Sequence, residues 1–453
     1  MTRILCVISL LGMFLMGSVT VGYAQPQKKK FVPQAQPKLQ KSKRKQAAAK
    51  GPRLGAKDVS RTQSNSRNQI DGKDKEIIRK LKSLIKETPN ASPEKAIFLD
   101  RLAEIYWQRA GTIDMRAFDQ EEKCLKAVST PEQMDVCKAT REKRTDRSQK
   151  FRDGAIKLYV KIVRNYPEYE ALDRVLFALG FNYQRKEQPE KAKKIYKKLV
   201  QMFPRSDKIP ETLFYFAELV FDEGKVDMAK KLYLRLVKNH KKSSIYGYAK
   251  YKLAWCYFNL QDFKAAMKAF IDVLQYSRKM KGGKQRLTLE TESLRDMVRT
   301  FVHIKGASPK SAIRFFKKYV RKDEPDRHLA MAEKVAQLYS DTGQVIQGNE
   351  LYRALIKERP KSYEVVGYQR AITDNTRSLD KPSKTVRALK RLVSLFKKRR
   401  NADDASSKRV KKDYKGIEEL VRSLGVTYHR QALKTENDQD YKVTELLYED
   451  YVD

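Results

Sequence analysis

Two cysteines, Cys124 and Cys137, are the pair of side chains whose spacing most directly predicts a chemistry. They lie at nearly equal distances on either side of a Ser-Thr-Pro turn at residues 129–131. Two antiparallel helices joined by this turn would bring the thiols together, and an oxidising compartment would then convert them to a disulfide. A metal site is the alternative, although two cysteines without a nearby histidine make a poor zinc ligand set.

The other candidate reactive side chains form no catalytic pattern. The four histidines are scattered at positions 240, 303, 328 and 429, and no Ser–His–Asp order, glycine-rich phosphate loop or paired-histidine zinc motif stands out. Cys256 lies inside a helical segment and is expected to be a small buried apolar residue. We therefore predict no enzyme activity, and no catalytic residue, metal or cofactor.

The elements that must position these residues recur with a step of 37 residues, as from Ala155 to Ala192. Small, aromatic and aliphatic positions all keep this step: Ala155, Ala192, Ala229 and Ala266; Tyr159, Tyr196, Tyr233 and Phe270; Ile162, Leu199, Leu236 and Val273. Within one unit the apolar residues fall at helical spacing. Such fixed-period similarity predicts stacked pairs of helices, each of which buries its apolar stripe against its neighbours.

The units resemble the tetratricopeptide repeat (TPR) family. Eight signature positions of that family are occupied by Leu176, Leu179, Gly180, Tyr183, Ala192, Tyr196, Leu199 and Pro204. Seven match again at Val335, Ala336, Tyr339, Gly348, Tyr352, Leu355 and Pro360, and five at Leu253, Ala254, Tyr257, Ala266 and Phe270. The resemblance implies an all-α superhelical solenoid of helix–turn–helix repeats. The Phe-Pro-Arg-Ser turn at 203–206 is also similar to turns of bacterial envelope TPR proteins, such as outer-membrane assembly lipoproteins and gliding-motility components.

The N-terminal segment predicts export. Arg3 precedes an uncharged stretch from Ile4 to Val21, and small residues end at Ala24, so residues 1–24 are predicted to be a cleaved signal peptide, with an uncleaved anchor as the alternative. Gln25 stands where a lipoprotein would need a cysteine. Residues 25–73 are predicted to be a disordered basic linker, because residues 25–75 hold fifteen Lys or Arg against three Asp, a net charge of +12.

The rest of the chain divides into four predicted segments. Residues 74–110 are an N-terminal helix and the start of the first repeat, and residues 111–150 are an inserted helical hairpin arm that carries the cysteine pair. Residues 151–362 are the core TPR array. Residues 363–453 are degenerate C-terminal repeats, interrupted by a polar break over 401–412.

The TPR resemblance implies a ligand-binding groove along the first helix of each repeat. The positions that would face a ligand are Arg174, Phe177, Phe181, Gln184 and Arg185; Glu211, Phe214, Glu218, Phe221 and Asp222; and Tyr248, Tyr251, Trp255, Phe258 and Asn259. Eight of these are aromatic, and rigid aromatic side chains give a large contact area for a bound peptide. The alternative is that the aromatic side chains pack between neighbouring repeats.

The formal net charge of +42 falls to +29 when Arg3 and residues 25–75 are removed (42 − 1 − 12). Much of this surplus is patterned at the repeat step, with one predicted stripe at Lys157, Lys194, Lys231 and Lys268 and a second at Lys161, Lys198 and Arg235. The stripes are either a solvated helix face or a surface that attracts polyanions.

We therefore predict a periplasmic scaffold or adaptor, peripheral to the outer membrane, that binds an envelope protein or peptide. Outer-membrane assembly, cell-wall coordination and gliding motility are the settings implied by the resemblance. The alternative is an envelope protein that binds lipopolysaccharide, a cell-wall polymer or anionic lipid through its basic surface. Nucleic acid fits the charge but not the export signal, and no nucleic-acid partner is predicted.

Overall fold

The computed structural model describes residues 74–280, 284–379 and 381–452, and every regular element in these ranges is a helix. This confirms the all-α prediction. A helix over 74–87 is followed by α2 (Glu94–Ala127), α3 (Pro131–Asn165), α4 (Leu172–Arg185), α5 (Pro189–Met202), α6 (Ile209–Asp222), α7 (Val226–Asn239), α8 (Tyr246–Asn259), α9 (Phe263–Lys279), α10 (Lys284–Phe301), α11 (Ser311–Lys317), α12 (Arg327–Asp341), α13 (Val345–Glu358), α14 (Glu364–Arg377), α15 (Pro382–Arg399), α16 (Ser407–Thr435) and α17 (Asp438–Val452). The predicted signal peptide (1–24) and basic linker (25–73) lie outside the described residues.

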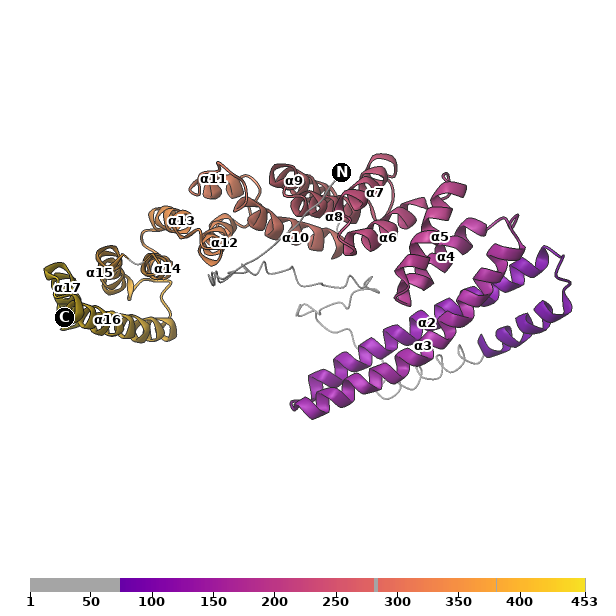
Figure 1. The fold of residues 1–453 in the computed structure, drawn as a ribbon, viewed down its shortest axis with the longest axis horizontal. Coiled ribbons are helices and arrows are strands. Elements are labelled where there is room, and N and C mark those ends of the chain that lie inside the picture. Colours follow the sequence, from indigo (N-terminus) through magenta and orange to yellow (C-terminus); the bar gives the residue numbers. More distant parts are fainter. Residues whose placement is uncertain (1–73, 281–283, 380, 453) are drawn as a thin grey trace, which may run out of the picture. The chain divides into compact units, whose positions relative to one another are not determined.

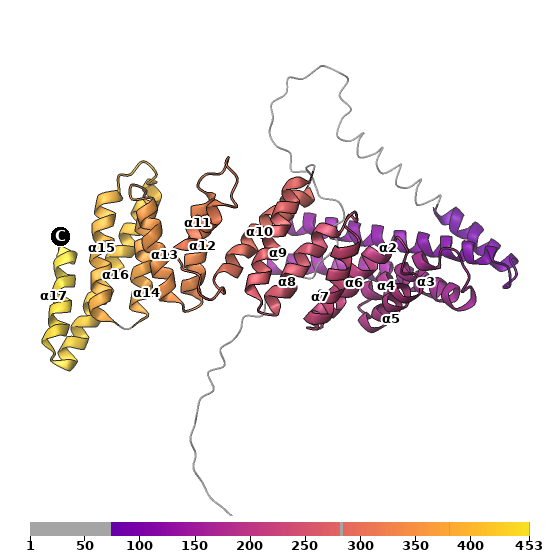
Figure 2. The same ribbon diagram turned by 90° about the horizontal axis from the view of Figure 1, so that it is seen from above.

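Consecutive helices pack as hairpins, α4 on α5, α6 on α7 and α8 on α9, and each hairpin packs on the next (Figures 1 and 2). The helices from α4 to α8 are each 14 residues long. Proline sets their limits: Pro189 opens α5, where a backbone N–H would have no intrahelical acceptor, and Pro204 follows the end of α5.

The residues that recur at the 37-residue step form the buried layer of the repeats. The alanines of the series are 0% exposed, Tyr196, Tyr233 and Phe270 are 0% exposed, and so are Leu199 and Leu236. Gly180 makes room for one of these rings, because a Cβ atom placed on it would come within 2.5 Å of the Tyr196 ring. The step found in the sequence therefore marks the side chains at which the two helices of a hairpin meet.

Two parts of the described chain depart from the regular pattern. The first hairpin is extended, since α2 and α3 are 34 and 35 residues long and run without interruption through the segment predicted as an arm. The second departure is α10, which packs on α8 and α9, while the short α11 packs on α12.

The C-terminal part continues the helix pairs. α14 packs on α15, and α17 packs on both α15 and α16. The predicted polar break over 401–412 is shorter than expected, because α16 already begins at Ser407 with Ser406 as its N-cap. The Ser406 hydroxyl accepts a hydrogen bond from the backbone N–H of Arg409, which has no acceptor within the helix, and this cap stabilises a helix start in a polar sequence. No helix among the described residues is both long and apolar enough to cross a membrane.

Candidate functional site

Several residues predicted to face a ligand instead connect neighbouring repeats. Arg174 in α4 donates to the carboxylate of Asp100 in α2, which is 2% exposed. Lys252 in α8 lies 2.7 Å from a carboxylate oxygen of Glu218 in α6. Burial raises the pKa of Asp100 above its ordinary value, so the guanidinium contact compensates a costly position for this charge.

Two further contacts of the same kind follow along the chain. The Tyr251 hydroxyl of α8 donates to Asp296 of α10 at 2.5 Å, and the Tyr368 hydroxyl of α14 donates to Glu333 of α12 at 3.2 Å. Burial also raises the pKa of Glu333. We call these four contacts the carboxylate ties. Each links one helix to the next but one along the chain, α2 to α4, α6 to α8, α8 to α10 and α12 to α14, so Arg174 and Tyr251 serve the packing of successive helices.

The prediction that Phe214 and Glu218 face a ligand is wrong. Phe214 is 3% exposed and packs edge-on against Tyr233, with ring centroids 5.9 Å apart. Glu218 is 8% exposed because it accepts a hydrogen bond from Tyr233 and pairs with Lys252. The alternative of packing between repeats therefore holds at these two positions.

Phe177 and Phe181 lie in a surface group that we call the first aromatic cluster. Its other members are Trp107 from α2 and Tyr215 from α6, and all four side chains are partly exposed. The ring of Phe181 lies 5.7 Å from that of Trp107 and 5.2 Å from that of Tyr215, centroid to centroid. Phe177 is 6.1 Å from Tyr215. Three successive first helices thus contribute rings to one continuous surface.

Trp107 and Tyr215 were not predicted as site residues. Trp107 lies on α2, in the hairpin directly before the α4 helix of Phe181, but the extended hairpin makes the separation 74 residues, so one 37-residue step back from Phe181 does not reach it. Tyr215 could not be found from the register either, because the register selects its neighbour Phe214. The two side chains differ because Phe214 turns toward α7, whereas Tyr215 remains at the surface.

Trp255 and Phe258 form a second aromatic group together with Phe263 and His303. Their rings are joined in sequence by centroid distances of 5.2 Å for Trp255–Phe258, 5.4 Å for Phe258–Phe263 and 4.7 Å for Phe263–His303. Trp255 also lies 6.0 Å from the fully buried Phe270. This tryptophan therefore packs against the core with one part of its ring and stays partly exposed to solvent.

The remaining predicted groove residues stay at or near the surface. Phe221 and Tyr248 are partly exposed, and the ammonium of Lys252 lies 5.9 Å from the centre of the Phe221 ring. Arg185 is partly exposed and lies 3.8 Å from Asp114.

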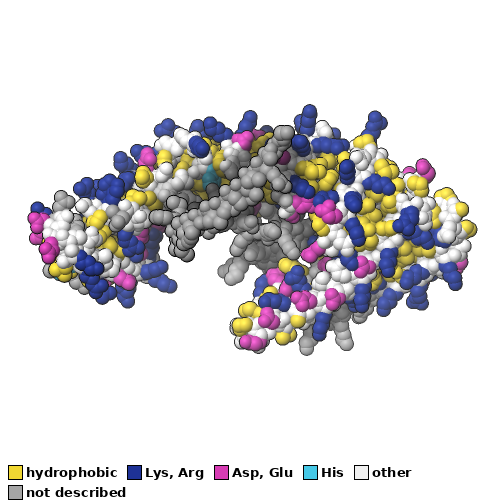
Figure 3. All heavy atoms as spheres, viewed as in Figure 1, with side chains coloured by type: hydrophobic (Ala, Val, Ile, Leu, Met, Phe, Trp, Pro, Cys, Tyr) yellow, Lys and Arg dark blue, Asp and Glu magenta, His cyan; other side chains and the backbone are white. Residues whose placement is uncertain are grey.

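The predicted basic stripe is exposed on successive second helices. Lys157, Lys194, Lys231 and Lys268 lie on α3, α5, α7 and α9, all four are exposed, and none forms an ion pair with another described residue. In the second predicted stripe, Arg235 is exposed, whereas Lys161 and Lys198 are partly buried. Figure 3 shows Lys and Arg side chains, in dark blue, spread over the visible face.

The predicted cysteine pair lies in the extended first hairpin. Cys124 of α2 and Cys137 of α3 are disulfide-bonded, with their Cα atoms 5.8 Å apart. The hairpin also carries apolar side chains that face solvent, since Met115, Phe118 and Val136 are 48%, 54% and 66% exposed. The disulfide thus crosslinks an arm whose outer surface is partly apolar.

The third cysteine of the described residues, Cys256, is a free and fully buried thiol. Burial, reinforced by the negative charge of Glu218, raises its pKa to about 12. A thiol that stays protonated at neutral pH is a poor nucleophile. Across 74–280, 284–379 and 381–452, no three His, Cys, Asp or Glu side chains are grouped so that they could hold a metal ion.

A profile of the tetratricopeptide repeat family matches residues 174–206 and 248–277, which correspond to α4–α5 and α8–α9. No curated protein matches the sequence. Tetratricopeptide repeats are modules of protein–protein interaction, so the matched segments belong to a scaffold for binding other proteins.

Several solved structures resemble the chain at low identity. A crystal structure of MamA protein is 15% identical over 52% of this chain and 96% of its own, with a TM-score of 0.30. A tetratricopeptide repeat protein from Parabacteroides merdae is 11% identical over 75% of this chain and 99% of its own, with a TM-score of 0.28. The C-terminal part of a TPR protein from Cytophaga hutchinsonii is 11% identical over 59% and 96%, with a TM-score of 0.33.

Proposed function

We propose that this tetratricopeptide-repeat protein is an exported adaptor of a bacterial cell envelope, and that it holds a peptide or loop of a partner protein on the first aromatic cluster. Outer-membrane assembly, cell-wall coordination and gliding motility are the settings in which such an adaptor would work. The observation that carries the proposal is the continuous group of partly exposed rings at Trp107, Phe177, Phe181 and Tyr215.

These rings are suited to a protein ligand for a physical reason. Aromatic side chains lose little conformational entropy on binding and offer a large apolar area, which is why they dominate the energetics of protein interfaces. The partly exposed guanidinium of Arg185, on the same helix as Phe177 and Phe181, adds a cationic group for the polar parts of a peptide. A bound segment would therefore contact both apolar and charged groups.

The partner test is a pull-down from crosslinked cells with the Trp107→Ala/Phe181→Ala variant. We expect recovery of the partner to fall by about ten-fold or more, because two central aromatic anchors are removed. Tyr441→Ala is the matched control, since Tyr441 is an exposed aromatic residue of α17 outside the cluster. Equal recovery by all three proteins, with helicity unchanged, would contradict the assignment of the cluster.

Export is tested separately by cell fractionation and N-terminal sequencing. The uncharged stretch before Ala24 supports cleavage by a signal peptidase, so we expect the protein in the periplasmic fraction with Gln25 as its first residue. A chain that keeps its first residues and stays in the cytoplasm would contradict the envelope setting, but not the aromatic binding surface.

A second candidate function is the binding of a polyanion such as lipopolysaccharide, a cell-wall polymer or anionic lipid. It is favoured by an exposed stripe of four lysines that form no ion pair within the described part of the chain: Lys157, Lys194, Lys231 and Lys268. Counterion release makes such binding fall steeply with salt. If this is the main function, replacing all four lysines with glutamate will abolish envelope association and flatten its salt dependence, and the aromatic variant will bind normally.

A further inference from the structure

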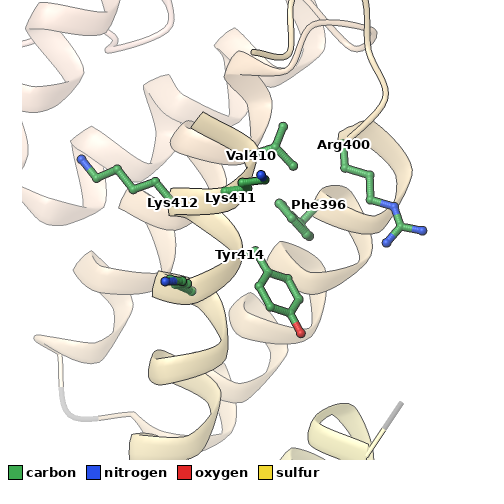
Figure 4. A pocket seen from close by; sticks show the side chains of 7 residues that line it. Phe396, Arg400, Val410, Lys411, Lys412 and Tyr414 are labelled. Carbon is green, nitrogen blue, oxygen red and sulfur yellow. The ribbon is translucent and has the colours of Figure 1, made fainter. Parts of the chain in front are cut away.

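A pocket of about 550 Å³ lies between the end of α15 and the beginning of α16 (Figure 4). Its apolar floor is formed by Phe396, Val410 and Tyr414. Phe396 is recessed at 6% exposure, whereas Tyr414 is 58% exposed, and their ring centroids are 6.2 Å apart. Figure 4 shows the Phe396 ring between Val410 and Tyr414. The pocket is thus open to solvent above an aromatic base.

The wall of this pocket is cationic. Arg400, Lys411, Lys412 and Lys415 line it, and none of the four forms an ion pair with another described residue. In Figure 4 the Lys412 side chain extends away from the rings, and Arg400, Lys411 and Lys415 are the other cations of the lining. We call these seven residues the C-terminal basic pocket.

The nearby carboxylates are committed to contacts elsewhere. Asp404 accepts hydrogen bonds from the Ser362 hydroxyl and from the backbone N–H of Tyr363, and the first of these contacts lowers the pKa of Asp404 below its ordinary value. Asp413 accepts from the Tyr363 hydroxyl at 3.1 Å. Glu364 accepts two hydrogen bonds from Arg409, at 2.6 and 3.0 Å.

This arrangement leaves the local charge unbalanced. Residues 396–415 contain nine Lys or Arg and three Asp, a net charge of +6. Of the three, Asp404 and Asp413 accept hydrogen bonds from Ser362 and Tyr363, the two residues just before α14. The cations of the wall are therefore available to an acidic ligand.

Among the side chains of the last helix that the structure describes, none forms an ion pair with a cation of the pocket. α17 packs along the later part of α16, where Tyr448 lies against His429 with a centroid distance of 5.7 Å and faces Gly425. The pocket residues of α16 lie at 410–415, more than two turns earlier. The pocket is therefore outside the part of α16 that carries this contact.

The two halves of the pocket define the ligand. A phosphate or a bare polyanion would use the cations but not the aromatic floor, and an uncharged apolar group would use the floor and leave the cations without a partner. A peptide with carboxylates next to one aromatic side chain satisfies both. We propose that the C-terminal basic pocket is a docking site for an acidic segment of a partner protein that packs one aromatic anchor against the apolar floor formed by Phe396, Val410 and Tyr414.

The test uses the full chain and a short peptide in which a photoreactive aromatic residue is flanked by glutamates on both sides. Irradiation should crosslink it to residues 396–415, as located by mass spectrometry. A peptide with alanine in place of the aromatic residue should bind about ten-fold more weakly in a fluorescence anisotropy assay at physiological ionic strength. Crosslinks scattered along the helices, or equal binding of both peptides, would overturn the proposal.

Variants separate the pocket from the general positive field of the protein. Tyr414→Ala should weaken binding about ten-fold without lowering the melting temperature, because this side chain is mostly exposed. Lys411→Glu/Lys415→Glu should weaken it further, whereas Lys397→Glu/Lys398→Glu, an equal charge change on exposed residues that do not line the pocket, should change it less than about two-fold. An equal loss of peptide affinity in both double variants would mean that binding depends only on the overall positive charge of the region, which would overturn the assignment of the pocket.

The same assay distinguishes other ligand classes. Polyphosphate or anionic phospholipid vesicles that displace the peptide, and that bind Tyr414→Ala as well as the unchanged protein, would assign the site to a polyanion and overturn the peptide proposal. The Trp107→Ala/Phe181→Ala variant should bind this peptide normally, so the outcome here is independent of the function proposed for the first aromatic cluster.

Discussion

Replacing the disulfide by Cys124→Ser/Cys137→Ser should destabilise the extended α2–α3 hairpin and little else. The crosslink joins residues separated by 13 positions. In the chain-entropy treatment, closing a loop of this size restricts the unfolded ensemble by about 3 kcal/mol. That stabilisation acts only on the arm, because each unit of a helical repeat array contacts only its immediate neighbours.

Hydrogen exchange measures this effect locally. A loss of about 3 kcal/mol corresponds to an increase in the opening equilibrium on the order of 100-fold. We expect faster exchange of this size in peptides from 113–148, and unchanged exchange in peptides from α6 to α9. The salt bridge of Arg141 with Glu121, at 3.0 Å, also joins the two helices but is largely exposed on the arginine side and should contribute little.

Two results would refute this reasoning. Unchanged exchange in the arm would mean that helix packing alone holds the hairpin closed, so that the disulfide adds nothing. Faster exchange throughout α4 to α9 would mean that the arm is coupled to the whole array, contrary to nearest-neighbour behaviour.

Three other predictions concern packing, pH and the N-terminal segment. Gly180→Ala should lower the free energy of unfolding by about 1–3 kcal/mol, because its new methyl group meets the Tyr196 ring. The control Gly111→Ala, with nothing within 4 Å of its new Cβ, should be neutral or stabilising. Equal melting temperatures for both variants would contradict this reasoning. Burial raises the pKa of Tyr169 and of Tyr352 to about 12, whereas a tyrosine of the unfolded chain titrates near ~10. The folded state therefore favours the neutral phenols, and the stability that they contribute below pH ~10 should be lost as the pH rises toward ~12. Absorbance of tyrosinate and circular dichroism should therefore change together in that range, and complete titration near pH ~10 with intact helicity would count against it. Deleting residues 25–73 should leave helicity and melting unchanged but weaken association with anionic envelope fractions at low salt; unchanged partitioning would reduce this segment to a spacer.

Much of the fold could be predicted from the sequence because its repeat is explicit. The apolar positions at the 37-residue step are almost completely buried, and Pro189 and Pro204 mark where α5 begins and ends. A periodic pattern predicts such features well, since each helix of a repeat must bury the same stripe. The start of α16 at Ser407 was missed because a polar composition says little when a good N-cap is present.

The surface was less predictable, because it depends on which side chain turns inward at a given position. Glu218 occupies a ligand-facing position of the family, yet Tyr233 and Lys252 draw it into the interior. These partners lie 15 and 34 residues away, on different helices, so the sequence around Glu218 does not predict them. The C-terminal basic pocket was missed for the same reason, since it requires the ends of two helices to meet.

The carboxylate ties have a consequence for how this array can change. The four ties use three kinds of donor: Arg174 meets Asp100, Lys252 meets Glu218, and the tyrosines Tyr251 and Tyr368 meet Asp296 and Glu333. A hairpin moved to another place in the order, or duplicated, would bring a buried carboxylate opposite a group that cannot neutralise or hydrogen-bond it, at a cost of about 3–5 kcal/mol. The repeats share one backbone fold, but their buried polar contacts differ. The carboxylate ties therefore favour one order of the units along the chain.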